Sequence, residues 1–548
     1  MKVGLRVPLL TIAAFFLLPN IAAAQDNAVQ GNPLHLQQGW SADTIDRWHF
    51  ISQGTPLIPY EWFLALEQPG QTALIRSPEN LQKLGFLVEP AGQNNLDGLA
   101  VGLYKLPVNF DDPKHKCWKG NWLGLGCAGC HTGQVNYRGQ QIRIEGGPAH
   151  INIDGFVDQI KKSIGGILQN PQAGASFLGR VTAPALDVQK GLACFADIFR
   201  DEMAFYSNKD LGTPAGFGRL DAHGIGLNQL LAVPLKENEN YAPPTAPVRY
   251  PALWDTPRFN WVLYNGSIRQ PLARNVIEAL GVQAPIQHDT MLGANVVHAI
   301  EMDNVIWGQR MLMDLRSPGW PESILGRLDP QRVARGKQLY ASECADCHDA
   351  RPAETRSEQG ACDEIRIPLF DLDTIGTDPE TATTFNKRRI SLSKIPRGPD
   401  DRGPDDIANY KAAEIATGKI TEQWIGRSPA NAAAADMVNC GRPNRFRAPL
   451  SYRARPLNGV WAMAPYLHNG SVPSLYDLLL PPNQRPKTFY VGNWEFDPEI
   501  VGYETKGPFP NAFTYDTWTR GNSNAGHAFG TDLSEENRKA LIEYLKTL

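Results

Sequence analysis

The sequence has little that would suit it to binding nucleic acid or crossing a membrane. Its 53 Lys and Arg are outnumbered by 57 Asp and Glu, which gives a net charge of −4. The basic excess that nucleic acid or an anionic membrane attracts is therefore missing. Beyond residue 24, no apolar run approaches the roughly 20 residues that a spanning helix needs. We expect no nucleic acid partner and no membrane span in the mature protein.

The first 24 residues are the exception. Lys2 and Arg6 precede an apolar stretch from Val7 to Leu18, and small residues at 22–24 follow it. A basic start, an apolar middle and a small-residue end are typical of a secretory signal peptide. We predict that residues 1–24 are removed and that the mature protein is periplasmic or secreted. An uncleaved anchor is the alternative, and the short apolar run argues against it.

Cysteine is also scarce, and four of the eight residues belong to two copies of one motif, GCAGCHTG and ECADCHDA. The motif cysteines and the histidine that ends each motif are Cys127, Cys130, His131, Cys344, Cys347 and His348. Two thiols at this spacing can add to the vinyl groups of one haem, and the histidine that follows supplies an axial ligand. The two motifs therefore predict two covalently bound haem c groups.

Two other interpretations fit the motifs less well. The two Cys pairs are too far apart in the sequence for a zinc module, which closes short loops. A thioredoxin-like redox pair has no use for a histidine after the second cysteine. The remaining cysteines, Cys117, Cys194, Cys362 and Cys440, can form two disulfides in an oxidising compartment, with three possible connectivities. The alternative is that some of them are buried free thiols.

Local patterns predict mainly helical structure with small strand elements. Residues 134–147 alternate apolar and polar side chains about a glycine, which is typical of a β-hairpin, and residues 151–168 show helical spacing. Asp329, followed by Pro330, is expected to cap a helix that leads into the second motif. Ser534 is expected to cap a helix that ends the chain. These two helices are expected to pack across one another, as in cytochrome c domains.

The prolines Pro318 and Pro321 indicate a domain boundary. We predict residues 25–325 as an N-terminal haem domain and residues 326–548 as a C-terminal cytochrome c-like domain. The expected fold class is mainly α, with two cytochrome c-like domains, long loops and small β-hairpins, and one haem c in each domain.

The second axial ligand of each iron decides what the iron can do, since a strong ligand makes an electron carrier and an open site can bind peroxide or dioxygen. After the second motif, the only histidines are His468 and His527. We favour His527, because its glycine-rich loop can approach a macrocycle closely, and keep His468 as the alternative. The sequence does not identify a second ligand for the first haem.

Several segments resemble a known group. Residues 457–479, LNGVWAMAPYLHNGSVPSLYDLL, resemble the signature segment of the dihaem bacterial cytochrome c peroxidase and MauG superfamily. The segments GCAGCHTGQ, IRIEGGPA, GRLDAHGIGLNQ, WVLYNGSIRQPLARN, GTDPETA and FYVGNWEFDP most resemble the rubber oxygenase-like dihaem cytochromes c. The likeness covers most of the chain from about residue 95 onward.

The resemblance implies two haem domains whose haems face each other. Where the peroxidases have a Met ligand and MauG-type enzymes a Tyr, this sequence has Pro482. The departure favours the oxygenase-like arrangement, in which a late histidine, matched by His527, completes the second haem and leaves the haem on His131 open. His468 would then lie near the second haem. One calcium ion, held in the peroxidases partly by a carbonyl at the position of Pro465, is a further candidate.

Three functions remain open. A peroxidase would take hydrogen peroxide and electrons from a small donor protein, and it needs an acid/base group above the iron. His150 is a candidate, although such a histidine is more often a surface residue. A dioxygenase would cleave an apolar alkene with dioxygen in an apolar pocket, for which Trp254 and Trp261 are candidates. The third function is electron transfer alone, with both irons six-coordinate.

Overall fold

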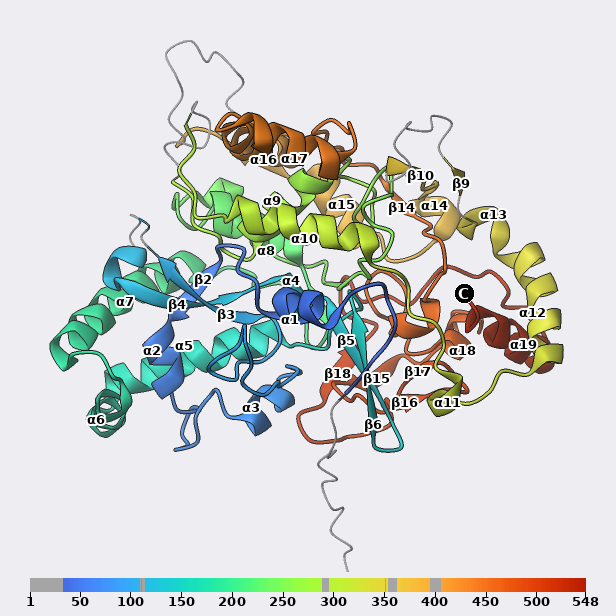
Figure 1. The fold of residues 1–548 in the computed structure, drawn as a ribbon, viewed down its shortest axis with the longest axis horizontal. Coiled ribbons are helices and arrows are strands. Elements are labelled where there is room, and N and C mark those ends of the chain that lie inside the picture. The colour runs from blue at the N-terminus through green and yellow to red at the C-terminus, as the bar shows by residue number, and fades with distance from the viewer. Residues whose placement is uncertain are drawn as a thin grey trace, which may run out of the picture.

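The structure is a computed structural model that describes residues 33–108, 110, 114–287, 295–349, 351–352, 362–394 and 406–548. The expected signal peptide, residues 1–24, lies outside these ranges. Helices predominate, and the strands form small sheets of two or three strands (Figure 1). Within the described ranges, no helix has both the length and the apolar character that crossing a membrane requires.

The helices are α1 (Ala42–Phe50), α2 (Tyr60–Ala65), α3 (Pro78–Lys83), α4 (Cys127–Cys130), α5 (Ile153–Gln169), α6 (Pro171–Arg180), α7 (Ala185–Tyr206), α8 (Ala222–Leu231), α9 (Pro271–Gly281), α10 (Met302–Asp314), α11 (Glu322–Leu325), α12 (Pro330–Glu343), α13 (Ala345–His348), α14 (Leu372–Ile375), α15 (Glu380–Lys387), α16 (Asn409–Ile425), α17 (Pro429–Asn439), α18 (Leu475–Leu478) and α19 (Glu535–Leu545).

The strands are β1 (Leu34–His35), β2 (Pro56–Pro59), β3 (Leu103–Val108), β4 (Gly120–Leu125), β5 (Thr132–Tyr137), β6 (Gln140–Glu145), β7 (Arg219–Leu220), β8 (Val248–Arg249), β9 (Arg351–Pro352), β10 (Ile365–Arg366), β11 (Leu369–Asp371), β12 (Arg389–Ser391), β13 (Asp406–Ala408), β14 (Ser451–Arg453), β15 (Thr488–Val491), β16 (Phe496–Asp497), β17 (Gly502–Tyr503) and β18 (Phe513–Asp516).

Two small sheets hold the first Cys motif between them. An antiparallel sheet of order β2-β4-β3 leads into α4, which carries the motif cysteines. The antiparallel strands β5 and β6 follow directly, and β1 pairs in parallel with β6. The turn between β5 and β6 places Arg138 and Gly139 at φ values of 50° and 80°, as a tight hairpin turn requires. The predicted hairpin is confirmed.

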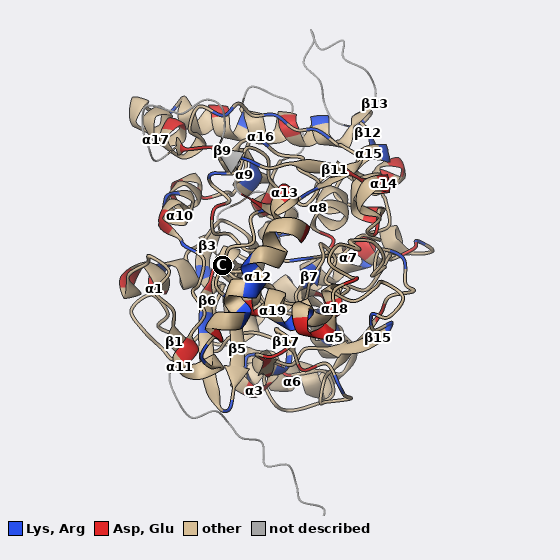
Figure 2. Cartoon of the chain, turned by 90° about the vertical axis from the view of Figure 1, so that its right-hand side faces the viewer, with Lys and Arg blue, Asp and Glu red and all other residues tan. Residues whose placement is uncertain are grey.

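The helices α12 and α19 pack side by side next to the second motif (Figures 1 and 2). The side chain of Asp329 accepts hydrogen bonds at the start of α12, and Ser534 caps α19. The helices approach so closely at Gly336 that a Cβ there would lie 2.0 Å from the carbonyl oxygen of Ala540. The predicted caps and the predicted packing of these two helices are confirmed.

A helical layer combines segments from both halves of the chain. Helices α16 and α17 lie against α9 and α10 (Figure 1). Their shared core contains Val276 of α9, Val305 of α10, Ile420 of α16 and Val438 of α17, all buried. Packed helices therefore join the two halves that the sequence separates near residue 325.

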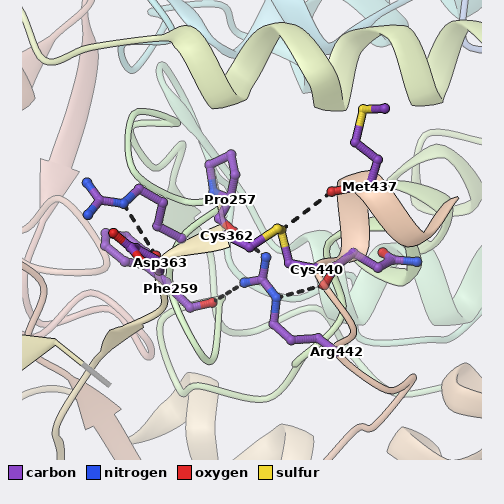
Figure 3. The surroundings of a disulfide bond; sticks show 9 residues. Pro257, Phe259, Cys362, Asp363, Met437, Cys440 and Arg442 are labelled. Carbon is purple, nitrogen blue, oxygen red and sulfur yellow. Dashed lines mark hydrogen bonds between the residues drawn. A yellow bond between two sulfur atoms is a disulfide. The ribbon is translucent and has the colours of Figure 1, made fainter. Parts of the chain in front are cut away.

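The four cysteines outside the motifs form two disulfides, Cys117–Cys194 and Cys362–Cys440. This is one of the three connectivities left open by the sequence. Figure 3 shows that Arg442, two residues after Cys440, donates hydrogen bonds to the carbonyl oxygens of Pro257 and Phe259. The second disulfide and this arginine together hold the segment that follows Trp254.

Candidate functional site

The first Cys motif forms one helical turn that places Cys127 and His131, but not Cys130, in the lining of a cavity. Helix α4 spans the two cysteines, and His131 ends it. The turn lies against Gly102, where a Cβ would come within 2.2 Å of the backbone of Gly129. This glycine, at φ 86°, therefore lets the motif fit against the chain that precedes β3. Cys127 and His131 line what we call the first cavity.

The second motif follows α12 in the same manner. Cys344 ends α12, and α13 carries Cys347 and His348. All three residues line what we call the second cavity, beside α12 and α19. The second motif therefore presents two thiols and one imidazole to a cavity, and the first motif presents one thiol and one imidazole.

Each motif histidine is oriented by a backbone carbonyl. His131 Nδ1 lies 2.9 Å from the carbonyl oxygen of Pro251, and His348 Nδ1 lies 2.8 Å from that of Arg455. A ring that donates from Nδ1 keeps Nε2 free as a metal ligand. Burial lowers the pKa of His131 to about 4 and also lowers the pKa of His348. Both imidazoles are therefore neutral at pH 7, as ligands must be.

None of the four motif cysteines forms a disulfide, whereas the other four cysteines are joined in two. Burial raises the pKa of Cys127 and of Cys344 to about 12. Among the described residues, no group of three or more His, Cys, Asp or Glu is arranged to hold a metal ion. These observations count against both the zinc and the disulfide interpretations of the motifs.

His527 faces His348 across the second cavity. Their ring centroids are 6.3 Å apart, and two imidazoles that share one metal place their centroids about 6 Å apart, because each ligating nitrogen lies about 2 Å from the metal. The His527 backbone is fixed at φ 45° by hydrogen bonds from its N–H to Ile375 and from Arg485 to its carbonyl. At Gly526 a Cβ would lie 2.2 Å from the backbone of Gly376. Only glycine fits at this position of the loop.

The second cavity is apolar but is lined by three arginines, Arg249, which is buried, and Arg453 and Arg455, which are half-buried. None of the three forms an ion pair with a described carboxylate, and Nη1 of Arg453 and Nε of Arg455 are buried without a hydrogen-bond partner. Buried cations without acidic partners are costly. The two propionates of a haem would supply the missing negative charge, so these residues fit that group.

His468 also lines the second cavity but in a different position. Its ring stacks on Tyr452 with centroids 4.2 Å apart, and its Nε2 is buried without a partner. Burial, followed by the charge of Arg249, lowers its pKa to about 3. The geometry favours His527 over His468 as the residue opposite His348, and places His468 at the wall of the cavity.

The first cavity is lined by polar side chains that the sequence did not single out. Helix α9 contributes Arg274 and Glu278, and α10 contributes Gln309. Arg274 donates to Gln309 at 2.8 Å and lies 3.9 Å from Glu278, while Nε2 of Gln309 is buried without a partner. Burial raises the pKa of Glu278, and the charge of Arg274 opposes this shift. A carboxyl and a guanidinium thus face the same space as Cys127 and His131.

A signal for these residues exists in the sequence. Arg274 and Glu278 are four positions apart, so they lie on one face of α9, and the residues around them are apolar. An ion pair inside an otherwise apolar helix indicates burial beside a site. The pattern is weak, because the same spacing is common on exposed helices.

The other predicted site residues line neither of these two cavities. Trp254 is fully buried, and its Nε1 donates to the carbonyl of Asn458 at 2.9 Å. Trp261 lies under the guanidinium of Arg447, 3.6 Å from its ring centroid. His150 is buried rather than at the surface, and its ring packs edge-on against Tyr503 at 4.2 Å. Pro465 lines the same separate pocket as His150; calcium stays a prediction.

The chain is similar to one protein-family model and to other known proteins. Residues 451–490, which include His468, match a family model described as RoxA-like, cytochrome c-like. An uncharacterized protein of Sinorhizobium fredii (strain NBRC 101917 / NGR234), y4iJ, is 33% identical over 565 aligned residues that cover 94% of this chain and 93% of y4iJ. A second uncharacterized protein of that strain, y4iM, is 26% identical over 358 residues, covering 61% of this chain and 72% of y4iM.

The match to the RoxA-like model implies haem c and supports, in general terms, the resemblance to dihaem cytochromes c. The similarity to y4iJ extends over nearly the whole of both chains. This chain belongs to the same family as y4iJ and carries a cytochrome c-like domain of the RoxA-like kind.

Proposed function

We propose that this protein is an exported oxidoreductase with two cytochrome c-like domains, each holding one haem c, that reduces hydrogen peroxide at the first haem. The observation that carries the proposal is the pair Arg274 and Glu278 in the first cavity. The second haem, between His348 and His527, would have no free position and would pass electrons on. The cytochrome c-like domain fits an exported protein, because haem c is attached outside the cytoplasm.

The chain's own groups suit the reduction of peroxide to two water molecules, which consumes two protons and two electrons. The haem would supply the bond to one peroxide oxygen and the electrons. The Glu278 carboxylate would take the proton from that oxygen and return it to the departing oxygen, as a general base and then a general acid. Arg274 would stabilise the negative charge that develops. A carboxyl whose pKa is raised by burial is suited to both steps.

Haem content tests the basis of the proposal. The mature polypeptide is expected to carry the mass of two haems, and replacing Cys127 and Cys130 together by Ala is expected to leave one, because both thioethers of the first haem are then lost. Mass spectrometry of the intact protein measures this. The matched control replaces the disulfide pair Cys117 and Cys194 by Ala and is expected to retain both haems. A wild-type protein with a single haem would contradict the proposal.

The ligand of the second haem gives a further prediction. Replacing His527 by Ala is expected to convert this haem from low spin to high spin, because it removes the imidazole opposite His348. Absorption and electron spin resonance spectra follow the change, and added imidazole should reverse it. The control, His468→Ala, is expected to keep the low-spin signal. A spin change in the His468 variant instead would show that the ligand is assigned to the wrong residue.

A second candidate function is the cleavage of an apolar alkene by dioxygen. The match of residues 451–490 to a RoxA-like model favours it, since rubber oxygenase-like cytochromes are the group that the sequence resembles. The polar first cavity speaks against it, because such a substrate needs an apolar pocket. Spectra of the isolated protein separate the two: a stable ferrous dioxygen complex indicates the dioxygenase, and oxidation by peroxide followed by reduction by a donor cytochrome indicates the peroxidase. A pure electron carrier would show neither and would not bind carbon monoxide.

A further inference from the structure

The carbonyl oxygens that orient the two motif histidines belong to segments that one side chain connects. His131 is held by Pro251, and His348 is held by Arg455. The guanidinium of Arg455 reaches back to the first of these segments, where Nη1 donates to the carbonyl of Ala252 at 3.1 Å and Nη2 donates to that of Trp254 at 3.3 Å. Because Ala252 directly follows Pro251, Arg455 contacts the residue next to the one that orients His131.

The result is a short route of covalent and hydrogen bonds between the two histidines. It runs from the His131 ring to the carbonyl of Pro251, along one peptide unit to the carbonyl of Ala252, and from there to the guanidinium of Arg455. It then follows the arginine itself to its own carbonyl, which accepts the hydrogen bond of His348. One residue therefore acts at both ends, through its side chain toward the first site and through its backbone toward the second.

The surroundings of Arg455 keep it in place. Its Cζ lies 5.7 Å from the ring centroid of Trp254 and 5.5 Å from that of Phe259. Trp254 is in turn held by the carbonyl of Asn458. Arg442, next to the Cys362–Cys440 disulfide, holds the carbonyl of Phe259 (Figure 3). Aromatic walls and fixed carbonyls leave the guanidinium little freedom to move.

We propose that Arg455 is a positioning residue that couples the two haem sites and carries the route by which electrons pass between them. This inference rests on the proposed function. In each transfer, the electron that a haem held by His348 would lose would be gained by a haem held by His131. Arg455 keeps its proton and its charge throughout, so the step needs no further reactant. The residue contributes geometry, because it fixes the distance and orientation of both histidines.

The test measures transfer between the haems in the full-length protein without peroxide. A laser flash generates a flavin semiquinone that reduces a small fraction of the haems, and absorbance then follows the redistribution of the electron. Arg455→Met removes the hydrogen bonds at similar side-chain length and is expected to slow redistribution about tenfold. Arg455→Lys keeps the charge but cannot reach both carbonyls, and it is also expected to slow the transfer.

The matched control is Arg447→Met, which removes a half-buried guanidinium that lines neither cavity and donates to the carbonyl of Gly266, and which leaves the route intact. It is expected to transfer electrons between the haems at the wild-type rate. Wild-type rates in both Arg455 variants, with both haems attached, would overturn the proposal, as would equal slowing in the Arg447 variant. If Arg455→Met loses haem, the lysine variant decides. Since no peroxide is used, a failure of the peroxidase proposal would appear separately, in the reaction with peroxide.

Discussion

Replacing Glu278 by Gln is expected to slow the reaction of the protein with hydrogen peroxide by about 10²- to 10⁴-fold, the usual contribution of one acid/base group. The substitution keeps the size of the side chain but removes the only carboxylate lining the described part of the first cavity. Stopped-flow absorbance after mixing with peroxide measures the rate. The wild-type rate should fall as the pH drops below the raised pKa of Glu278, and the variant should lose that dependence.

The control for this prediction is Glu79→Gln on α3, an exposed glutamate outside both cavities. It is expected to react with peroxide at the wild-type rate. Both variants should retain two haems and unchanged resting spectra. A Glu278 variant that reacts as fast as wild type would remove the acid/base role and, with it, the observation on which the peroxidase proposal rests.

Loss of the Cys362–Cys440 disulfide is expected to lower the free energy of unfolding by about 4.5 kcal/mol, the chain-entropy value for a loop of this length. The cysteines are 78 residues apart in sequence, and the loop between them includes α14, α15 and α16. The double variant Cys362→Ser, Cys440→Ser isolates the effect. Urea unfolding, followed by haem absorbance and by circular dichroism, measures it.

The matched control for the disulfide is the pair Cys117 and Cys194, which are 77 residues apart. Chain entropy alone predicts nearly equal losses for the two double variants. The Cys362 and Cys440 variant should also free the segment after Trp254, because Arg442 holds Pro257 and Phe259 from the same place. A loss below about 1 kcal/mol would show that the packing of α17 on α9 and α10 fixes this region without the disulfide.

Local signals in the sequence predicted several elements of the fold. Alternation about Gly139 predicted the β5–β6 hairpin, and the caps Asp329 and Ser534 predicted α12 and α19, because these features act within a few residues. The packing of α16 and α17 on α9 and α10 could not be predicted in this way. It depends on apolar faces far apart in the sequence, and periodicity does not say which face meets which. The disulfide connectivity could not be predicted for the same reason, because it also depends on which distant segments meet.

The site residues also fall into those that a local pattern predicts and those that depend on distant contacts. The motif cysteines and histidines were identified because haem attachment imposes a fixed spacing, and His527 was favoured because glycine marks a close approach. Arg274 and Glu278 were missed because their helix otherwise reads as an ordinary apolar one. His150 was expected more often at the surface, and its burial against Tyr503 depends on a residue more than 300 positions away. The spacing of residues in the sequence does not predict contacts between such distant positions.

The helical layer of α9, α10, α16 and α17 has a consequence for biogenesis. The first motif is synthesised early, but the helix that brings Arg274 and Glu278 to it rests on helices that end only at Asn439. Until this layer has formed after export, we expect Cys127 and Cys130 to remain accessible for the attachment of haem. The helix that carries Arg274 and Glu278 would close over the site afterwards.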